Sequence, residues 1–187
     1  MTWWNPTTLT VSLVAVVTAT ALTAGSTSAQ AVTGSELKAA YLFNFVRFME
    51  WSSDPVPPGT NVALCVVNDA LVAAALERTV RGRTVQGHAL SVRTLNPGAP
   101  LPICQLLYLA GATLQQSLDA IAPVKDSVVL TVSDAERFAY MGGMVELFVE
   151  TGRIRFTVNT DALRRGRVVL SSRVLTLAKI VTDGQTK

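Results

Sequence analysis

The spacing of apolar side chains changes along the chain, and these changes predict an alternation of helices and strands. Between residues 36 and 51, apolar residues recur every three or four positions, as they do on the buried side of an amphipathic helix. Continuous apolar runs bounded by turn residues are typical of strands buried on both faces. Such runs occur at residues 62–67, 103–109 and 128–132, and weaker patterns predict strands at 90–95 and 168–170.

Polar side chains that can accept a hydrogen bond from a free backbone N–H mark where helices begin. Thr33 and Glu36 have the spacing of a capping box, which predicts a first helix that ends near Trp51. Further helices are expected after Asn68-Asp69, over 113–121, from Ser133-Asp134 to about Met141, over 159–165, and after Ser171-Ser172.

Two apolar segments in the C-terminal half, 145–149 and 154–158, flank the turn Glu150-Thr151-Gly152-Arg153 and predict a β-hairpin. Strands that alternate with helices indicate an α/β fold, and an antiparallel hairpin makes the sheet mixed. The sequence contains no fixed-period repeat. We therefore expect a single α/β domain with a mixed β-sheet and flanking helices.

Charge is absent from the first 35 of the 187 residues. Within them, an apolar run over residues 9–24 leads to small residues and the A-x-A sequence Ala29-Gln30-Ala31, as in a secretory signal peptide. We predict that residues 1–31 are a cleaved signal peptide, with cleavage after Ala29 as the alternative. A membrane anchor is a second interpretation, but a spanning helix needs roughly 20 apolar residues. The mature domain, 32–187, is expected to lie outside the membrane.

Export changes the meaning of the two cysteines, Cys65 and Cys104. In an oxidising compartment such a pair tends to form a disulfide. Two separate buried thiols are the alternative. A redox-active pair more often has the spacing C-x-x-C, which this sequence lacks.

The composition excludes several kinds of active site. A single histidine, His88, rules out sites built on two imidazoles, and two cysteines rule out four-cysteine zinc or iron–sulfur sites. The sequence has neither G-x-G-x-x-G nor a Gly-Lys-Ser/Thr sequence, so dinucleotide and P-loop sites are not expected. A net charge of +3 is too small to indicate nucleic-acid binding. We expect no catalysis, no cofactor, no metal and no nucleic-acid partner.

Arginine supplies most of the positive charge, with 12 arginines against 4 lysines. Its planar guanidinium favours carboxylate or phosphate partners. Helix N-termini also attract anions. We therefore consider an anionic ligand held by hairpin arginines and by the start of the last helix, that is, by Arg153, Arg155, Ser171, Ser172 and Arg173. A solvated basic surface and ordinary helix capping are the alternatives.

The first predicted helix has aromatic residues on its charged side. At 100° per residue, Phe43 falls among Glu36, Arg47 and Glu50, with Trp51 at the margin. Exposed aromatic residues often dominate the energetics of protein interfaces. Phe43, Arg47 and Trp51 are therefore candidate contacts for a partner protein, unless the helix is buried on both sides.

Several segments, in order, resemble the YfiR/HmsC-like family. The first is the helix sequence LKAAYLFNFVRFMEW at residues 37–51. The later ones are Gly82-Arg83-Thr84-Val85, Ile103-Cys104, Leu130-Thr131-Val132-Ser133-Asp134, Gly142-Gly143-Met144, Arg153-Ile154-Arg155-Phe156, 159–165 and 170–178. The resemblance spans nearly the whole mature chain.

This resemblance implies a periplasmic α/β protein that binds the periplasmic sensor domain of an inner-membrane diguanylate cyclase and holds the cyclase inactive. Release would raise cyclic di-GMP and biofilm formation. Because related domains also occur in sensor kinases, another membrane sensor is an alternative partner. The resemblance further implies a disulfide between Cys65 and Cys104, without the second cysteine pair of some relatives. A periplasmic sensor of a small anionic ligand is the alternative function, and a homodimer is compatible with either.

Overall fold

The computed structural model describes residue 1, residues 34–50, residue 57 and residues 59–185. The predicted signal peptide, both cleavage positions, Thr33 and Trp51 lie outside the described residues. Residues 32–187 form one compact unit. Within the described ranges, no helix is long and apolar enough to cross a membrane.

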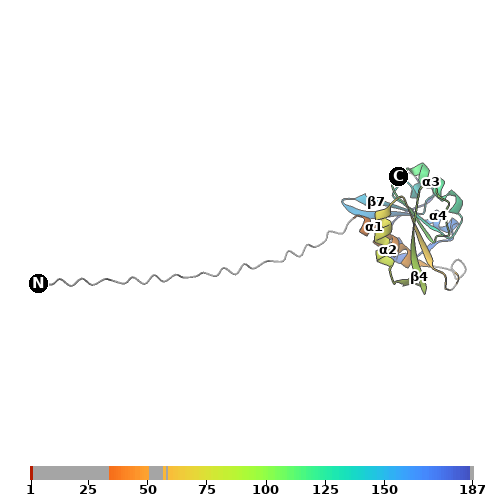
Figure 1. Ribbon diagram of the computed structural model, residues 1–187. Coiled ribbons are helices and arrows are strands. Elements are labelled where there is room, and N and C mark those ends of the chain that lie inside the picture. Colours follow the sequence, from red (N-terminus) through yellow and green to blue (C-terminus); the bar gives the residue numbers. More distant parts are fainter. Residues whose placement is uncertain (2–33, 51–56, 58, 186–187) are drawn as a thin grey trace. The chain divides into compact units, whose positions relative to one another are not determined.

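A mixed sheet of eight strands forms the centre of the domain, in the order β10-β8-β7-β6-β5-β2-β4-β3 (Figure 1). Its strands are β2 (Val62–Val67), β3 (Thr84–Val85), β4 (His88–Leu95), β5 (Leu106–Leu109), β6 (Leu130–Ser133), β7 (Val145–Glu150), β8 (Arg153–Asn159) and β10 (Lys179–Val181). Two further strands, β1 (Met49–Glu50) and β9 (Val169–Leu170), pair antiparallel with each other. The predicted α/β fold with a mixed sheet is confirmed.

The strands β4, β2, β5, β6 and β7 run parallel to one another, whereas β8 returns antiparallel to β7. After β2, the chain first adds β4 on one side of β2 and then adds β5 on the other side of β2. In open α/β sheets, ligands bind beyond the carboxyl ends of strands near such a reversal. This edge of the sheet is therefore the first place to look for a site.

Helices cover the sheet unequally. They are α1 (Gly34–Arg47), α2 (Ala70–Val80), α3 (Leu114–Ile121), α4 (Thr160–Arg165) and α5 (Ser172–Leu175), with 3-10 turns at Ala122–Val124 and Ala139–Met141. α1 and α2 pack together on one face, over a core that includes Leu64, Val66 and Leu106 (Figure 1). α3 lies over the other face, whose smaller core includes Cys65, Leu107 and Ile121. Between β4 and β5 the chain forms no helix.

Local capping explains why several helices begin where the sequence predicts. The Asp69 carboxylate accepts a hydrogen bond of 2.9 Å from the Val72 N–H at the start of α2. Thr113 and Gln116 form a reciprocal capping box at α3. The hairpin turn is also as predicted, because Thr151 (φ 47°) and Gly152 (φ 73°) are both left-handed, as a two-residue turn requires.

Two helix predictions are wrong. Ser133 is the last residue of β6, and the chain after it forms only the 3-10 turn Ala139–Met141. The final helix, α5, has only four residues, because Lys179–Val181 pairs in parallel with β8 as strand β10. Tertiary pairing of the chain outweighs the helical spacing of apolar residues there. The first helix is likewise shorter than predicted, since Met49 and Glu50 form β1.

Candidate functional site

The carboxylate of Asp134 joins three segments at the carboxyl ends of the central strands. The Lys38 ammonium of α1 donates to Oδ2 at 2.8 Å, and the Tyr108 hydroxyl of β5 donates to the same oxygen at 3.1 Å. The Gly111 N–H donates to Oδ1 at 2.9 Å. Asp134 therefore fixes α1 and the end of β5 relative to the end of β6.

Asp134 and Tyr108 each favour one protonation state. Burial acts to raise the pKa of Asp134, but hydrogen bonds from Lys38 and from the Gly111 N–H outweigh burial and lower it. Burial and the neighbouring Asp134 charge both raise the pKa of the Tyr108 hydroxyl. The arrangement is thus a carboxylate that accepts from an ammonium and a phenol, with shifts that favour the ionised carboxylate and the protonated phenol.

An open cavity of about 590 Å³ adjoins this cluster. Lys38, Asp134 and the loop Gly111-Ala112-Thr113 form its polar side. Leu147, Val149 and Ile154 of the hairpin form its apolar side. Such a cavity suits a small molecule with both polar and apolar parts. Within the described residues, no group of three or more His, Cys, Asp or Glu side chains is placed to hold a metal ion.

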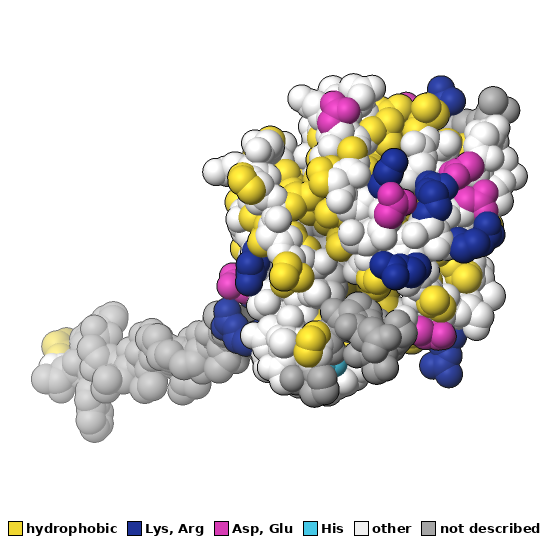
Figure 2. All heavy atoms as spheres, turned by 90° about the vertical axis from the view of Figure 1, so that its right-hand side faces the viewer, with side chains coloured by type: hydrophobic (Ala, Val, Ile, Leu, Met, Phe, Trp, Pro, Cys, Tyr) yellow, Lys and Arg dark blue, Asp and Glu magenta, His cyan; other side chains and the backbone are white. Residues whose placement is uncertain are grey.

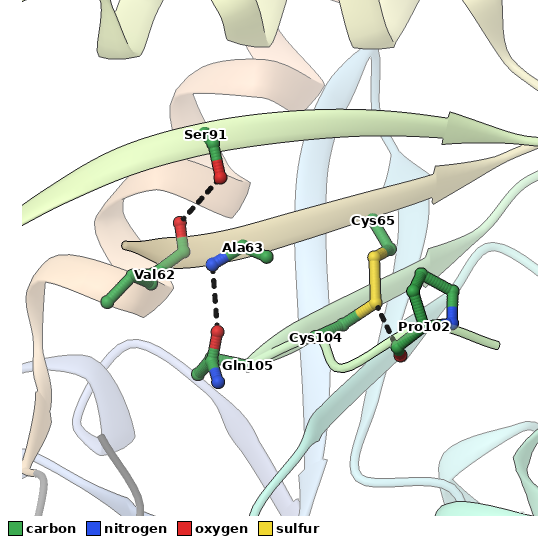
Figure 3. Close-up of a disulfide and its surroundings, with 7 residues drawn as sticks. All are labelled: Val62, Ala63, Cys65, Ser91, Pro102, Cys104 and Gln105. Carbon is green, nitrogen blue, oxygen red and sulfur yellow. Dashed lines mark hydrogen bonds between the residues drawn. A yellow bond between two sulfur atoms is a disulfide. The ribbon is translucent and has the colours of Figure 1, made fainter. Parts of the chain in front are cut away.

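Cys65 and Cys104 form a disulfide on the face of the sheet opposite α1 and α2 (Figure 3). Their Cα atoms are 6.0 Å apart, and 39 positions separate them in the sequence. The bond ties β2 to the segment that leads into β5. The predicted disulfide is confirmed, and the alternative of two separate thiols is wrong.

The predicted anion-binding residues fall into two groups. Arg153 and Arg155 are exposed on β8, and Arg155 lies 3.8 Å from the Glu150 carboxylate. At α5, the Ser171 hydroxyl accepts from the Arg173 N–H at 3.3 Å, so Ser171 caps a helix of four residues. Within the part of the chain that the structure describes, no hydrogen bond or ion pair joins the two groups. Anion binding by them stays a prediction.

Basic side chains on the outer surface are interspersed with acidic ones on the face shown in Figure 2. Arg164 pairs with Asp161 at 3.0 Å, and Arg165 pairs with Asp183. Arginines in these pairs form part of a solvated, charge-balanced surface, which was the alternative interpretation of the arginine clusters.

The candidate partner contacts on the first helix differ in exposure, and Phe43 is buried rather than exposed. Phe43 is only 8% exposed and packs in the main core, with the Arg83 guanidinium 5.1 Å from its ring centroid. The expectation that Phe43 stands exposed among charges is therefore wrong, because Arg83 and the core enclose it. Arg47 is exposed, with its guanidinium 5.5 Å from the Phe48 ring centroid. Trp51 lies outside the described residues.

Sequence reasoning missed the cluster of Lys38, Tyr108 and Asp134. Capping rules place Asp134 at a helix start, but no α-helix begins there, and it is the Ser133 hydroxyl that accepts from the Ala135 N–H. The position of Asp134 directly after a buried parallel strand was the usable signal. No spacing rule links Lys38 to it, since the two residues lie 96 positions apart.

In a comparison with known families, the sequence model described as YfiR/HmsC-like matches residues 35–179. The matched range runs from α1 to the beginning of β10 and so contains the cavity, the Asp134 cluster and the disulfide. No curated protein matches the chain.

Proposed function

The chain belongs to the YfiR/HmsC-like family, and on that basis we propose that it is a periplasmic regulatory protein that represses an inner-membrane diguanylate cyclase. It would bind the periplasmic domain of the cyclase, or of a similar sensor, and hold it inactive. Loss of binding would raise cyclic di-GMP and biofilm formation. The family match over residues 35–179 is the observation that carries this proposal.

Several structural features support an exported binding protein. The disulfide is of the kind that persists in oxidising compartments. The uncharged, apolar first segment supports export through a signal peptide. The pKa of Asp134 is lowered and that of Tyr108 is raised, so the carboxylate stays ionised and the phenol protonated, which suits a structural role rather than acid–base catalysis.

For the partner surface we propose the end of α1, with Arg47 as the exposed charge. Trp51, which follows in the sequence and lies outside the described residues, remains the second proposed contact. Phe43 supports this surface from below rather than contacting the partner at its centre. Exposed charges at an interface mainly guide association and specificity. A homodimer is compatible with this arrangement, because a partner at the end of α1 leaves the rest of the domain surface open for a second copy of the chain.

Binding of the mature chain, 32–187, to the periplasmic segment of an inner-membrane diguanylate cyclase from the same organism tests the proposal. We expect saturable binding in biolayer interferometry, weakened about tenfold by Arg47→Glu, which corresponds to about 1.4 kcal/mol. Lys125→Glu makes the same charge change at another exposed position and serves as the control. Absence of binding by the wild-type chain would contradict the proposal.

A second function, sensing of a small ligand, is favoured by the cavity beside Asp134. The polar rim and the apolar hairpin side of this cavity suit an amphipathic molecule. For an anionic ligand bound outside this cavity, the proposed contacts remain Arg153, Arg155, Ser171, Ser172 and Arg173. Thermal-shift measurements with nucleotides and amino acids at millimolar concentration test this function. No shift with any of them counts against it.

A further inference from the structure

A second hollow, of about 530 Å³, lies over β2 and β4 on the face opposite α1 and α2. The apolar side chains Leu90 and Val92 turn to the helix-covered face, so Ser91 and Arg93 turn to the other. Ser91 lies opposite Ala63 in the sheet, and Arg93 lies opposite Cys65. The small side chains of Ala63 and Ser91 thus line the bottom of the hollow, and the Arg93 side chain lies beside them.

The hollow exists because the connection from β4 to β5 contains no helix. The segment that enters β5 closes one side of it with Ile103 and Gln105, and Gly59-Thr60-Asn61 closes another. The disulfide at Cys104 fixes this segment to β2, next to Gln105 (Figure 3). The wall that carries Gln105 is therefore held covalently.

Gln105 lines the hollow, and within the described residues its side-chain NH₂ group makes no hydrogen bond. The residue is only 8% exposed, and its Oε1 accepts from the Ala63 N–H at 2.8 Å. Because the group that faces an N–H must be the oxygen, the Nε2 amide is turned away from Ala63 (Figure 3). Within the described residues, this NH₂ group has no hydrogen-bond partner. A buried donor left unpaired is costly unless a ligand or water satisfies it.

The charge of the lining fits an anion. Arg93 is the only charged residue among the described residues that line the hollow, and it forms no ion pair within them. Ser91 adds a hydroxyl that is held only loosely, 3.5 Å from the Val62 carbonyl. Donors thus predominate, and no carboxylate of the lining competes for them.

We propose that this hollow binds a carboxylate group of a small organic anion, with Arg93, Gln105 and Ser91 as its donors. A planar guanidinium and a carboxamide match the two oxygens of a carboxylate. One guanidinium balances the single negative charge of a carboxylate, whereas phosphate groups carry about −1.5 to −2 at neutral pH. The site lies on the face of the sheet opposite α1, and the proposal does not depend on the proposed function.

Titration with benzoate and, in a parallel series, with inorganic phosphate tests the proposal. The readout is the ¹H–¹⁵N resonance of the Gln105 side-chain amide and of Arg93 Nε–H in the mature chain, up to about 50 mM, a range that covers millimolar affinities. We expect a saturable shift of both resonances with benzoate and a weaker response to phosphate. No saturable shift, or tighter binding of phosphate than of benzoate, would overturn the proposal.

Two variants and a control assign the shift to this site. Arg93→Gln removes the guanidinium, and Gln105→Glu removes the NH₂ while keeping an oxygen for the Ala63 N–H. Each should weaken benzoate binding at least about tenfold. Arg81→Gln alters an exposed arginine outside the hollow and should leave binding unchanged. If Gln105→Glu does not fold, the affinity of Arg93→Gln for benzoate decides between the outcomes. Equal affinity of Arg93→Gln and Arg81→Gln for benzoate would overturn the proposal.

Discussion

Lys38 on the first helix and Asp134 after the sixth strand form an ion pair of 2.8 Å across 96 residues of sequence. Their side chains are 26% and 21% exposed, so the pair is largely shielded from water. The same carboxylate also holds the Tyr108 hydroxyl and the Gly111 N–H. This pair therefore couples the position of α1, the proposed partner helix, to the strand ends that border the cavity.

Replacement of Asp134 by Asn should destabilise the domain. The amide keeps an oxygen for the Gly111 N–H but loses the charge that pairs with Lys38. We expect a loss of about 2 kcal/mol in the free energy of unfolding at pH 7, as for hydrogen bonds to charged groups. Urea unfolding measures it. Glu150→Gln is the control, because its exposed pair with Arg155 should contribute less than about 0.5 kcal/mol.

The effect of Asp134→Asn should depend on pH. The pKa of Asp134 is lower in the folded protein than in the unfolded chain. Its contribution is therefore complete above the unfolded value of about 3.9 and is lost as the pH falls through the folded value. The difference in unfolding free energy between wild type and variant should be large at pH 7 and shrink below about pH 4. A difference that stays constant down to acid pH would show that the charge of Asp134 contributes nothing.

Removal of the disulfide should cost stability without changing the fold. On the chain-entropy model, closing a loop of this length contributes about 4 kcal/mol. The double variant Cys65→Ala/Cys104→Ala should therefore unfold at a lower urea concentration than the oxidised wild type. A reducing agent should destabilise the wild type and leave the double variant unaffected. Equal stability of oxidised and reduced wild type would contradict this prediction.

Phe43→Ala separates a core role from a partner contact. Since Phe43 is buried, we expect a loss of about 3 kcal/mol in unfolding free energy. Arg83→Gln removes only the guanidinium that covers the ring and should cost less than about 1 kcal/mol. Thermal unfolding and partner binding are measured on the same samples. Near wild-type stability with weakened binding would show that Phe43 is a contact residue after all.

Gly143→Ala should also destabilise the domain. A Cβ atom at this position would overlap the ring of Phe138, which is fully buried. Overpacking of this kind costs about 1–3 kcal/mol. Gly34→Ala, at the start of α1, meets no atom within 4 Å and should leave stability nearly unchanged. Comparable stability of the two variants would mean that the Phe138 ring can shift.

The parts of the fold that the sequence predicts are those set by local chemistry. The apolar run at β2, the Asp69 cap and the Thr151-Gly152 turn depend on neighbouring residues, and each agrees with the structure. The failures come from distant contacts. Residues 179–181 form a strand because β8 lies beside them.

The candidate sites follow the same division. The expectation of export is enough to predict the pairing of the two cysteines, because an oxidising compartment favours a disulfide. The burial of Phe43 depends on Arg83, and the Asp134 cluster depends on Lys38, and neither neighbour is near in sequence. Helical periodicity alone therefore misplaced Phe43, and capping rules alone misassigned Asp134.

The level of cyclic di-GMP in cells tests the proposed repressor role most directly. We expect deletion of the gene to raise cyclic di-GMP and complementation with the full chain to restore the wild-type level. A chain without residues 1–31 should fail to complement, because it would stay on the wrong side of the inner membrane. An unchanged level of cyclic di-GMP after deletion, in cells that express the cyclase to which the chain binds, would contradict the account.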